Sequence, residues 1–280
     1  MKQKLSRLMI VTIVLLLTML LLTACGDGGA EVGETDPGFV YLPEYIGLPE
    51  DVDNIEGMTY QNEQLYFYFT GVIGNKEPKS PLKPGDAEYY DGMYDVYGPS
   101  LCKINLDGTG FEKLSAFVPL AMPDGMSGNT NINSICFDKD GNLWVAESGY
   151  MNHTTEAGEW VDDGTIYSIR KLDSTGAELA KMDLTAIAAE HDPDQGAFAI
   201  GKMVVDDAGN CYFTDGNINV YVLDAQGQKL VSLKVDNWIQ GIVKSIDGKV
   251  GVVAYETDAL NFKPIDLAAK SWGTAIPLPY

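Results

Sequence analysis

The sequence is poor in the residues that most hydrolytic and metal-dependent active sites use. It has only two histidines, His153 and His191, which leaves little for a histidine base or a histidine-rich metal centre. It also lacks a G-x-S-x-G elbow, an H-E-x-x-H helix and a glycine-rich phosphate loop. We therefore predict no catalytic residues, no metal site and no cofactor. A bound divalent cation has no motif to support it, and a protein that is not an enzyme is favoured.

Cysteine is scarce as well. Apart from Cys25, the chain has Cys102, Cys136 and Cys211, each within an apolar run. Their odd number and the absence of C-x-x-C spacing argue against a disulfide framework and against a zinc site. We expect these three cysteines to be small buried hydrophobic residues.

Positive charge is the third scarcity. The chain has 19 Lys and Arg residues against 40 Asp and Glu residues, and three of the basic residues lie in the first seven positions. Without those three, 16 basic residues face 40 acidic ones, a net charge of −24. A surface of this sign repels polyanions, so nucleic acid is excluded as an expected partner.

No apolar run is long enough to span a bilayer as a helix. The longest one, Met9–Leu22, has 14 residues and would span about 21 Å, short of the roughly 30 Å of hydrocarbon. A positively charged leader precedes it, so residues 1–24 are predicted to be a secretory signal peptide. The Leu-x-Ala-Cys sequence that ends at Cys25 resembles the bacterial lipobox.

The lipobox resemblance implies that Cys25 becomes the first residue and carries a lipid. Residues 25–37 then form a lipidated cysteine and a flexible tether, because they are rich in glycine and acidic residues. The protein is expected to be lipid-anchored to the cell membrane and to face the extracellular side. An ordinary signal peptide with an incidental cysteine is the alternative.

Two stretches of the sequence repeat one pattern: FDKDGNLWVAE at residues 137–147 and VDDAGNCYFTD at residues 205–215. Each has a short apolar run, an Asp, the dipeptide Gly-Asn, a second apolar run and a final acid. Gly-Asn between alternating apolar runs predicts a tight β-hairpin, since Gly or Asn accepts the positive φ of the turn. A motif Ile-x-x-Ile or Ile-x-x-Met precedes each hairpin, and weaker copies bring the number to four; the motifs begin at Ile55, Ile132, Ile200 and Ile239.

A second predicted hairpin follows each of the first ones. The second hairpins occupy residues 101–114, 166–182 and 220–233, with a degenerate copy at 262–276. In the first three copies the turn reads Leu-Asp-x-x-Gly, so each unit predicts four antiparallel strands. The motifs start 77, 68 and 39 residues apart, and the last spacing is close to the roughly 40–50 residues of a propeller blade.

We therefore predict an all-β fold: a β-propeller of four-stranded antiparallel blades within residues 38–280. Such sheets cover one another's apolar faces when they pack side by side around an axis. About four blades are recognisable, at approximately 50–117, 130–184, 198–236 and 237–280, and a strand at Phe39–Ile46 could complete the last one. The ring is either small and closed or incomplete. A β-sandwich is the alternative, but it needs no shared four-strand period.

Four segments carry a resemblance to a known family: PEYIGLPEDVDNIEGM, INSICFDKDGNLWVAE, VYVLDAQG and KPIDLAAKSWGTAIPLP. They resemble the amino-terminal region of large clostridial lipoproteins classed as extracellular solute-binding proteins. The resemblance implies propeller blades after a lipobox, followed in that family by a periplasmic-binding-type domain. It favours a membrane-anchored binding or scaffold module associated with solute capture. A fragment of a longer solute-binding lipoprotein is a further alternative.

The predicted insertions all fall in one class of loop. In a propeller whose strands run outward as A to D, the loops B–C and D–A lie on the same face. The insertions at residues 72–98 and 148–164 are B–C loops, and those at 118–131 and 185–198 are D–A loops. Because binding residues concentrate on loops held by a rigid scaffold, this face is the predicted binding face.

Two of these insertions combine aromatic rings with amide and acidic groups. The candidate ligand-binding residues are Tyr89, Tyr90, Asp91, Tyr94, Tyr97, Tyr150, Asn152, His153 and Trp160. Such rings stack on the C–H faces of sugars or contact peptides, so a carbohydrate, a peptide, another small molecule or a transport-complex protein is the expected partner. The alternative is that the aromatic residues only fold the long loops back onto the blades.

An enzymatic alternative comes from the hairpin itself. FDKDGNLWVAE is similar to strand pairs of streptogramin-lyase-like and gluconolactonase-like propellers, and that resemblance implies a metal ion near the central channel. Glu147 and Asp215 end their B strands, where such ligands could lie. The alternative is that each acid pairs with a neighbouring group. Asp138 begins a sequence similar to a calcium loop, but the loop has no glutamate at its twelfth position, so it predicts a turn.

Overall fold

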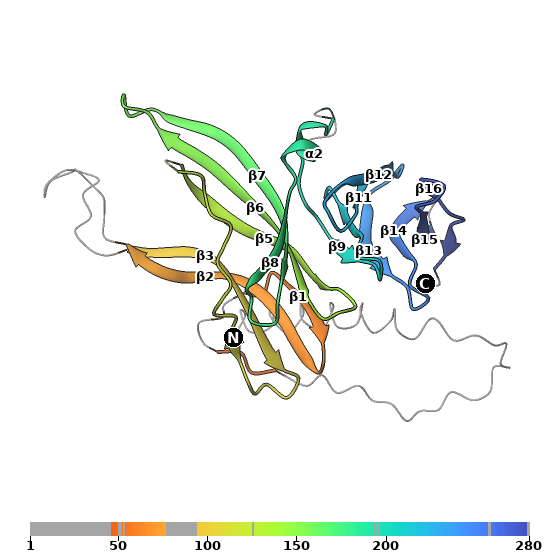
Figure 1. Ribbon diagram of the computed structural model, residues 1–280, viewed down its shortest axis with the longest axis horizontal. Helices are drawn as coiled ribbons and strands as arrows, with labels where there is room; N and C mark the ends of the chain where they lie inside the picture. The colour runs from red at the N-terminus through yellow and green to blue at the C-terminus, as the bar shows by residue number, and fades with distance from the viewer. Residues whose placement is uncertain are drawn as a thin grey trace, which may run out of the picture. The chain divides into compact units, whose positions relative to one another are not determined.

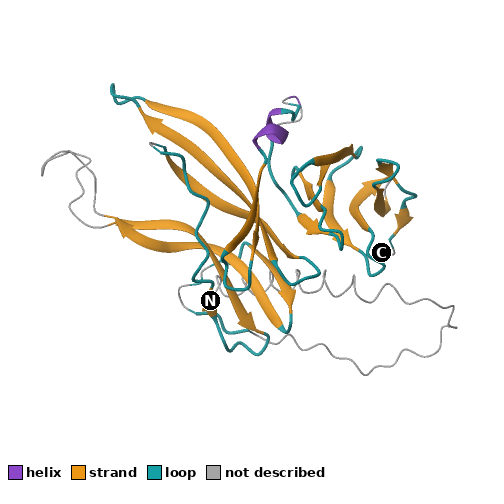
Figure 2. Cartoon of the chain, in the orientation of Figure 1, coloured by secondary structure: helices purple, strands orange, loops and turns teal. Residues whose placement is uncertain are grey.

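The computed structural model describes residues 46–49, 52, 54–76, 94–124, 126–192, 194, 197–256 and 259–278. The chain divides into two units, residues 1–47 and 48–280, and the fold given below is that of the second unit. Its described part is built of strands, with one short helix, α2 (Thr185–Ala189) (Figure 1, Figure 2). No helix within these ranges has the length and hydropathy needed to cross a membrane.

The strands form four antiparallel sheets, each made of consecutive strands in chain order. The first sheet contains β1 (Gly57–Gln61), β2 (Gln64–Lys76), β3 (Tyr94–Asn105) and β4 (Glu112–Lys113). The second contains β5 (Ser127–Phe137), β6 (Leu143–Thr154), β7 (Trp160–Leu172) and β8 (Glu178–Asp183). The third contains β9 (Met203–Val205), β10 (Cys211–Thr214), β11 (Asn219–Leu223) and β12 (Lys229–Lys234). The fourth contains β13 (Ile239–Lys244), β14 (Val250–Glu256), β15 (Ala259–Asp266) and β16 (Ser271–Trp272), and β17 (Ile276–Pro277) also pairs with β15.

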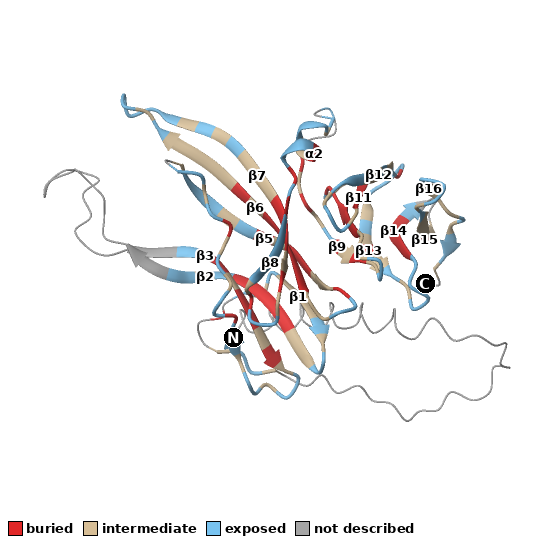
Figure 3. Cartoon of the chain, viewed as in Figure 1, coloured by how far each residue is buried: buried red, intermediate tan, exposed pale blue. Residues whose placement is uncertain are grey.

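This arrangement confirms the predicted all-β propeller of four-stranded blades. We call the sheets blades 1 to 4. Each blade meets the next through an apolar core, drawn as the red segments near the middle of the strands in Figure 3. Blades 1 and 2 share one core, blades 2 and 3 a second, and blades 3 and 4 a third. Among the described residues, no apolar core joins blade 4 to blade 1.

Strand alternation explains how one blade supplies two cores. In β6, Val145 packs in the core shared with blade 1, whereas its neighbour Ala146 packs in the core shared with blade 3. Successive side chains of a strand point to opposite faces of the sheet, so a fully apolar run serves a strand that is covered on both sides. Burying both faces in this way stabilises each blade by the removal of apolar area from water.

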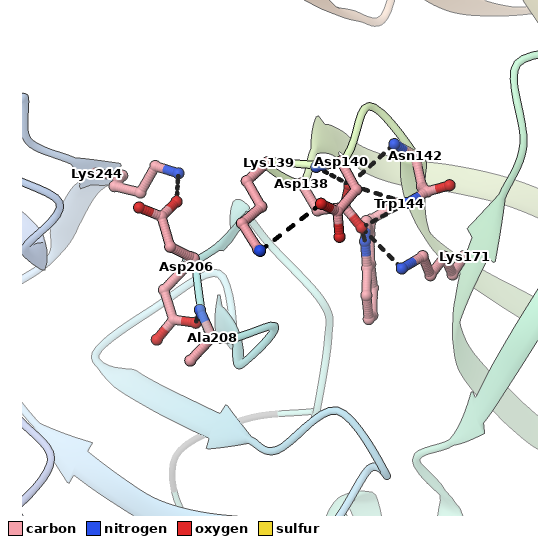
Figure 4. A network of polar contacts seen from close by, with 10 residues as sticks. Asp138, Lys139, Asp140, Asn142, Trp144, Lys171, Asp206, Ala208 and Lys244 are labelled. Carbon is pink, nitrogen blue, oxygen red and sulfur yellow. Dashed lines mark hydrogen bonds and ion pairs between the residues drawn. The ribbon is translucent and has the colours of Figure 1, made fainter.

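The turns between the first two strands of a blade explain the repeated Asp-x-x-Gly-Asn. In blade 2, the Asp138 carboxylate accepts hydrogen bonds from the backbone N–H of Asp140 (3.0 Å) and of Asn142 (2.9 Å), and Gly141 has a φ of +84° (Figure 4). In blade 3, Asp206 accepts the equivalent bonds from the N–H of Ala208 and Asn210. The tight hairpins predicted from Gly-Asn are therefore present in both blades.

The same carboxylates also accept a hydrogen bond from the first aromatic residue of the following strand. The indole Nε1 of Trp144 donates to Asp138 (3.0 Å), and the hydroxyl of Tyr212 donates to Asp206 (2.9 Å). In blade 2 the Lys171 ammonium, from β7, also lies 2.9 Å from Asp138. This carboxylate thus ties the turn to two strands of its own blade.

In blade 1 a different turn connects the first two strands. Its first two strands are joined by Asn62 and Glu63, with φ of +51° and +62°. Two consecutive residues with positive φ form the tightest hairpin connection, a type I′ turn. This turn accounts for the spacing in blade 1, which is one residue shorter than in the other blades.

The described parts of the segments predicted as long B–C loops are mostly paired strands, and the prediction of loops there was wrong. Residues 148–154 continue β6, and residues 160–164 belong to β7. Residues 72–76 and 94–98 likewise extend β2 and β3, and residues 77–93 lie outside the described part. Pairing gives each backbone N–H and C=O of a long insertion a partner, which an open loop would leave to water.

The D–A insertions were also predicted as loops, and two parts of them are regular. Residues 127–131 extend β5, where they pair with residues 148–152 of β6. Residues 185–189 form α2, whose Ile187 is buried in the core between blades 2 and 3. Cys102, Cys136 and Cys211 are free cysteines. Cys102 and Cys211 are buried as predicted, whereas Cys136 is only partly buried.

Substitution of Asp138 tests the role of the turn. Burial alone would raise the pKa of Asp138, but hydrogen bonds from Lys171, Trp144 and Asn142 outweigh it and hold the pKa below its ordinary value. A carboxylate with a lowered folded-state pKa stabilises the fold above its unfolded pKa of about 3.9, and this stabilisation is lost as the pH falls through the folded pKa. We expect Asp138→Asn to lower the free energy of unfolding by about 1.5–3 kcal/mol at pH 7.

The measurement is urea denaturation of wild type and variant between pH 7 and pH 3. The difference between the two proteins should shrink as the pH falls below about 4. Asp140→Asn is the matched control, because Asp140 is exposed and its side chain makes a surface ion pair with Lys139 at 3.7 Å. Equal losses for the two variants would contradict the assignment of Asp138 as the turn-locking residue.

Candidate functional site

The candidate site is the part of blade 2 in which three strands extend beyond the interblade cores. We call it the blade 2 arm: residues 127–131 of β5, 148–154 of β6 and 160–166 of β7. Figure 1 shows β6 and β7 as a long hairpin that continues past β8. Its tip is closed by a turn in which Gly158 N–H donates to the Thr155 carbonyl at 2.9 Å.

The register of the arm brings three of the predicted ligand-binding residues onto one face. Asn152 lies opposite Asp162, and Thr154 lies opposite Trp160. Because alternate residues of a strand share a face, Tyr150, Asn152 and Trp160 lie on the same side of the sheet. The rings of Tyr150 and Trp160 stack, with centroids 6.2 Å apart and planes inclined by 28°. We call this side of the arm, with Asp162, the aromatic face.

Asp162 also lies on the aromatic face, although the sequence pattern did not predict it as a binding residue. Its Oδ1 accepts a hydrogen bond from the backbone N–H of Gly164 at 2.7 Å. Burial and the nearby Asp162 carboxylate raise the pKa of Tyr150. The two-residue spacing from Trp160 would have pointed to Asp162, but only if residues 160–164 had been predicted as a strand.

The other predicted residues are not brought together on this face. His153 points to the opposite side of the arm, where its Nδ1 lies 2.6 Å from a carboxylate oxygen of Asp163. Tyr97 belongs to β3 of blade 1 and is exposed. Tyr94 lies at the start of β3. Tyr89, Tyr90 and Asp91 lie outside the described residues, as do Cys25 and the side chain of Tyr94.

Glu147, one of the two acids considered as metal ligands, is engaged inside the protein. Its side chain is fully buried, and both carboxylate oxygens accept hydrogen bonds from Arg170, at 2.5 Å from Nε and 2.7 Å from Nη2. Arg170 Nη2 also donates to the carbonyl of Val118, in the segment that connects blades 1 and 2 (2.9 Å). Burial raises the pKa of Glu147, and the adjacent guanidinium offsets part of that rise.

Asp215, the second acid, caps a turn of its own chain. Its Oδ1 accepts hydrogen bonds from the backbone N–H of Asn217 (2.8 Å) and Asn219 (3.0 Å). Its Oδ2 accepts one from the side-chain amide of Asn219. The expectation that a strand-end acid pairs with neighbouring backbone amides therefore holds for Asp215, whereas Glu147 forms a buried ion pair instead. Within the described ranges, no three His, Cys, Asp or Glu side chains are grouped so that they could hold a metal ion.

Comparison with known proteins supports the propeller architecture but assigns no function. The family model described as "Two component regulator propeller" matches residues 125–149, a range that includes β5 and the beginning of β6 in blade 2. No curated protein matches the chain.

Solved structures give only distant similarity. A protein of unknown function from Bacteroides caccae aligns at 17% identity and a TM-score of 0.41, over 66% of this chain and 56% of that one. A gluconolactonase from Xanthomonas campestris aligns at 14% identity and a TM-score of 0.36, over 71% of this chain and 54% of that one. The chain thus spans a little over half the length of these two proteins.

The Glu147–Arg170 pair supports a sharp prediction. Removing Arg170 leaves the fully buried Glu147 carboxylate without a compensating charge, which costs about 3–5 kcal/mol. We expect Arg170→Met to lower the free energy of unfolding by this amount, and Glu147→Met by less, because Arg170 keeps its ion pair with Glu178 at 3.4 Å. The double variant should be less destabilised than Arg170→Met, because no buried charge remains unpaired.

Thermal and urea denaturation of the three variants measure this effect. Wild-type protein treated with EDTA is the control, and its melting temperature should not change. A melting temperature that drops on chelation, or a double variant as unstable as the sum of the two single ones, would contradict a purely internal role for Glu147.

Proposed function

We propose that this protein is a lipid-anchored, extracytoplasmic binding module that captures a carbohydrate through the aromatic face of the blade 2 arm. The propeller acts as a rigid scaffold, and the arm presents the binding residues away from the cores. Cys25 carries the lipid, and the ligand is held without chemical conversion.

The exposed stack of Trp160 on Tyr150 is the observation that carries this proposal. Trp160 keeps 60% of its surface exposed, although tryptophan is among the side chains that gain most from burial. Neither ring belongs to any of the three interblade cores. This supports a binding role over the alternative that these rings only fold the arm back onto a blade.

The polar neighbours suit a sugar. A stacked indole ring offers an apolar plane for the C–H face of a pyranose, and the amide of Asn152 and the carboxylate of Asp162 can exchange hydrogen bonds with hydroxyl groups at its edge. Negative charge at Asp162 and Asp163, in the part of β7 that extends past β8, also discourages pairing with another strand. Together these features favour a sugar over an extended peptide added to the sheet edge.

The metal-dependent lyase or lactonase is less well supported as a function for this chain. The two acids that would have to bind the metal, Glu147 and Asp215, already accept hydrogen bonds from Arg170 and from a turn. If either acid bound a metal, these contacts would have to break. In the case of Glu147, the buried Arg170 guanidinium would lose its carboxylate partner.

Trp160→Ala tests the proposal by isothermal titration calorimetry against a panel of neutral oligosaccharides. Loss of one aromatic stacking partner is worth about 0.5–1.5 kcal/mol, so the Kd should rise about 2- to 10-fold. The melting temperature should stay unchanged, because the ring supports no core. Trp238→Ala is the matched control, since Trp238 is 65% exposed and lies before blade 4.

Three results would overturn the carbohydrate assignment. One is the absence of heat with every oligosaccharide, and another is an equal effect of Trp160→Ala and Trp238→Ala. The third is binding of peptides in place of sugars. A large drop in the melting temperature of Trp160→Ala would instead assign the ring to folding.

Cys25→Ala tests the anchor. We expect the variant to leave the membrane pellet and appear in the soluble fraction, because the lipid is attached to the Cys25 sulfur. Cys102→Ala is the control, as Cys102 is buried in blade 1 and should leave fractionation unchanged. Retention of Cys25→Ala in the pellet would contradict the lipid anchor.

A further inference from the structure

The four Ile-x-x-Ile or Ile-x-x-Met motifs lie outside the aromatic face and form a second candidate site. Their third and fourth residues, from all four blades, line one cavity of about 240 Å³. Because the motifs form or precede the first strand of each blade, this cavity lies where the four innermost strands meet. We call it the axial pocket.

The residues at the third position of the motifs determine both the size and the charge of the axial pocket. In chain order they are Gly57, Ser134, Lys202 and Gly241. Three of them are small, so the pocket is not filled by side chains at this level. Lys202 brings the only charged side chain among the described residues that line the pocket.

Two other polar side chains around the axial pocket, those of Asn133 and Tyr68, already form hydrogen bonds within the protein. Asn133 is fully engaged: its Nδ2 donates to the Ile200 carbonyl, and its Oδ1 accepts from the Ser148 hydroxyl, both at 3.0 Å. Tyr68 donates its hydroxyl to the carbonyl of Asn133 (3.0 Å). Burial and then the charge of Glu56 raise the pKa of Tyr68 to about 12, so the phenol stays protonated.

Gln240 is the residue positioned to act together with Lys202. It sits at a register shift in β13, between Ile239 and Gly241, where it is left out of the pairing with β14. A residue at such a bulge is turned away from the regular ladder. Gln240 lines the axial pocket and is exposed, so its side-chain amide is available to a ligand.

The Lys202 side chain is exposed, and no neighbouring carboxylate among the described residues balances its charge. Some lysines of the described chain do pair with carboxylates, for example Lys171 with Asp138 and Lys244 with Asp207. Within the same described ranges, Lys202 forms no ion pair, and no carboxylate lines the pocket. Glu56, the nearest acid in the motifs, accepts a hydrogen bond from the backbone N–H of Thr70 (3.2 Å).

We propose that the axial pocket binds a small carboxylate monoanion through the Lys202 ammonium and the Gln240 amide. The single cation compensates one negative charge, whereas a phosphate dianion would keep an uncompensated charge inside a chain whose net charge is −21. A charge-assisted hydrogen bond from the ammonium supplies the affinity, and the amide orients the ligand. The cavity is smaller than the roughly 300–1,000 Å³ of drug-binding sites, so the ligand has the size of a sugar acid or an amino acid.

The test is isothermal titration calorimetry of the full chain with glucuronate, glucose and inorganic phosphate. We expect glucuronate to bind, and glucose and phosphate to bind at least about tenfold more weakly. Lys202→Met should weaken glucuronate binding about tenfold or more, since it removes the ammonium and keeps the length of the side chain. Lys234→Met is the control, because it makes the same change on the outermost strand of blade 3.

A second variant tests the pocket without altering any charge. A Cβ added at Gly241 meets no atom within 4 Å, so Gly241→Leu should fold and should reduce glucuronate binding by occupying space. The proposal is overturned if glucuronate does not bind, if glucose binds equally well, or if Lys202→Met and Lys234→Met behave alike. Lys202→Met should leave the binding of neutral oligosaccharides at the aromatic face unchanged, so failure at the aromatic face and failure at the axial pocket are distinguishable.

Discussion

The whole structure depends on the need of each four-stranded sheet to bury both of its faces. A blade has apolar side chains on two sides, and its own strands cannot cover either side. Blade 2 meets this need with neighbours on both flanks, so Val145 and Ala146 lie in different cores although they are adjacent in the chain. Packing the blades side by side in this way also brings their innermost strands together, and the axial pocket lies between these strands.

Much of the fold could be predicted because its signals are local. Gly-Asn and Asp-x-x-Gly each specify a turn within a few residues, and alternating apolar residues on either side specify the strands. The Asp138 carboxylate shows why the Asp recurs: it replaces the partners that the turn's backbone N–H groups would otherwise lack. The repetition of such units was sufficient to predict blades and a propeller.

The site was predictable only in part, because its geometry depends on register. Residues 148–164 have mixed polarity and contain glycine, which is typical of a loop, yet residues 148–154 and 160–164 pair as strands. Whether Asn152 and His153 share a face depends on that pairing, and the structure places them on opposite sides. The partner of Glu147 is 23 residues away, and no local pattern connects the two. The same holds for the axial pocket, whose lining comes from four motifs that are distant in sequence.

The blade 2 arm has a mechanical consequence, because its strands are the same strands that line the cores. β6 runs without interruption from Leu143, in the core shared with blade 1, to Thr154 near the tip. Because a turn joins β6 and β7 at the tip, tension applied along the arm pulls both strands in the same direction. It therefore shears β6 against β5 and β7 against β8, and it loads the hydrogen bonds of these ladders simultaneously. Tension applied across the arm would instead break the hydrogen bonds one after another from the tip. Cargo pulled in the direction of the strands would be held far more firmly than cargo pulled sideways.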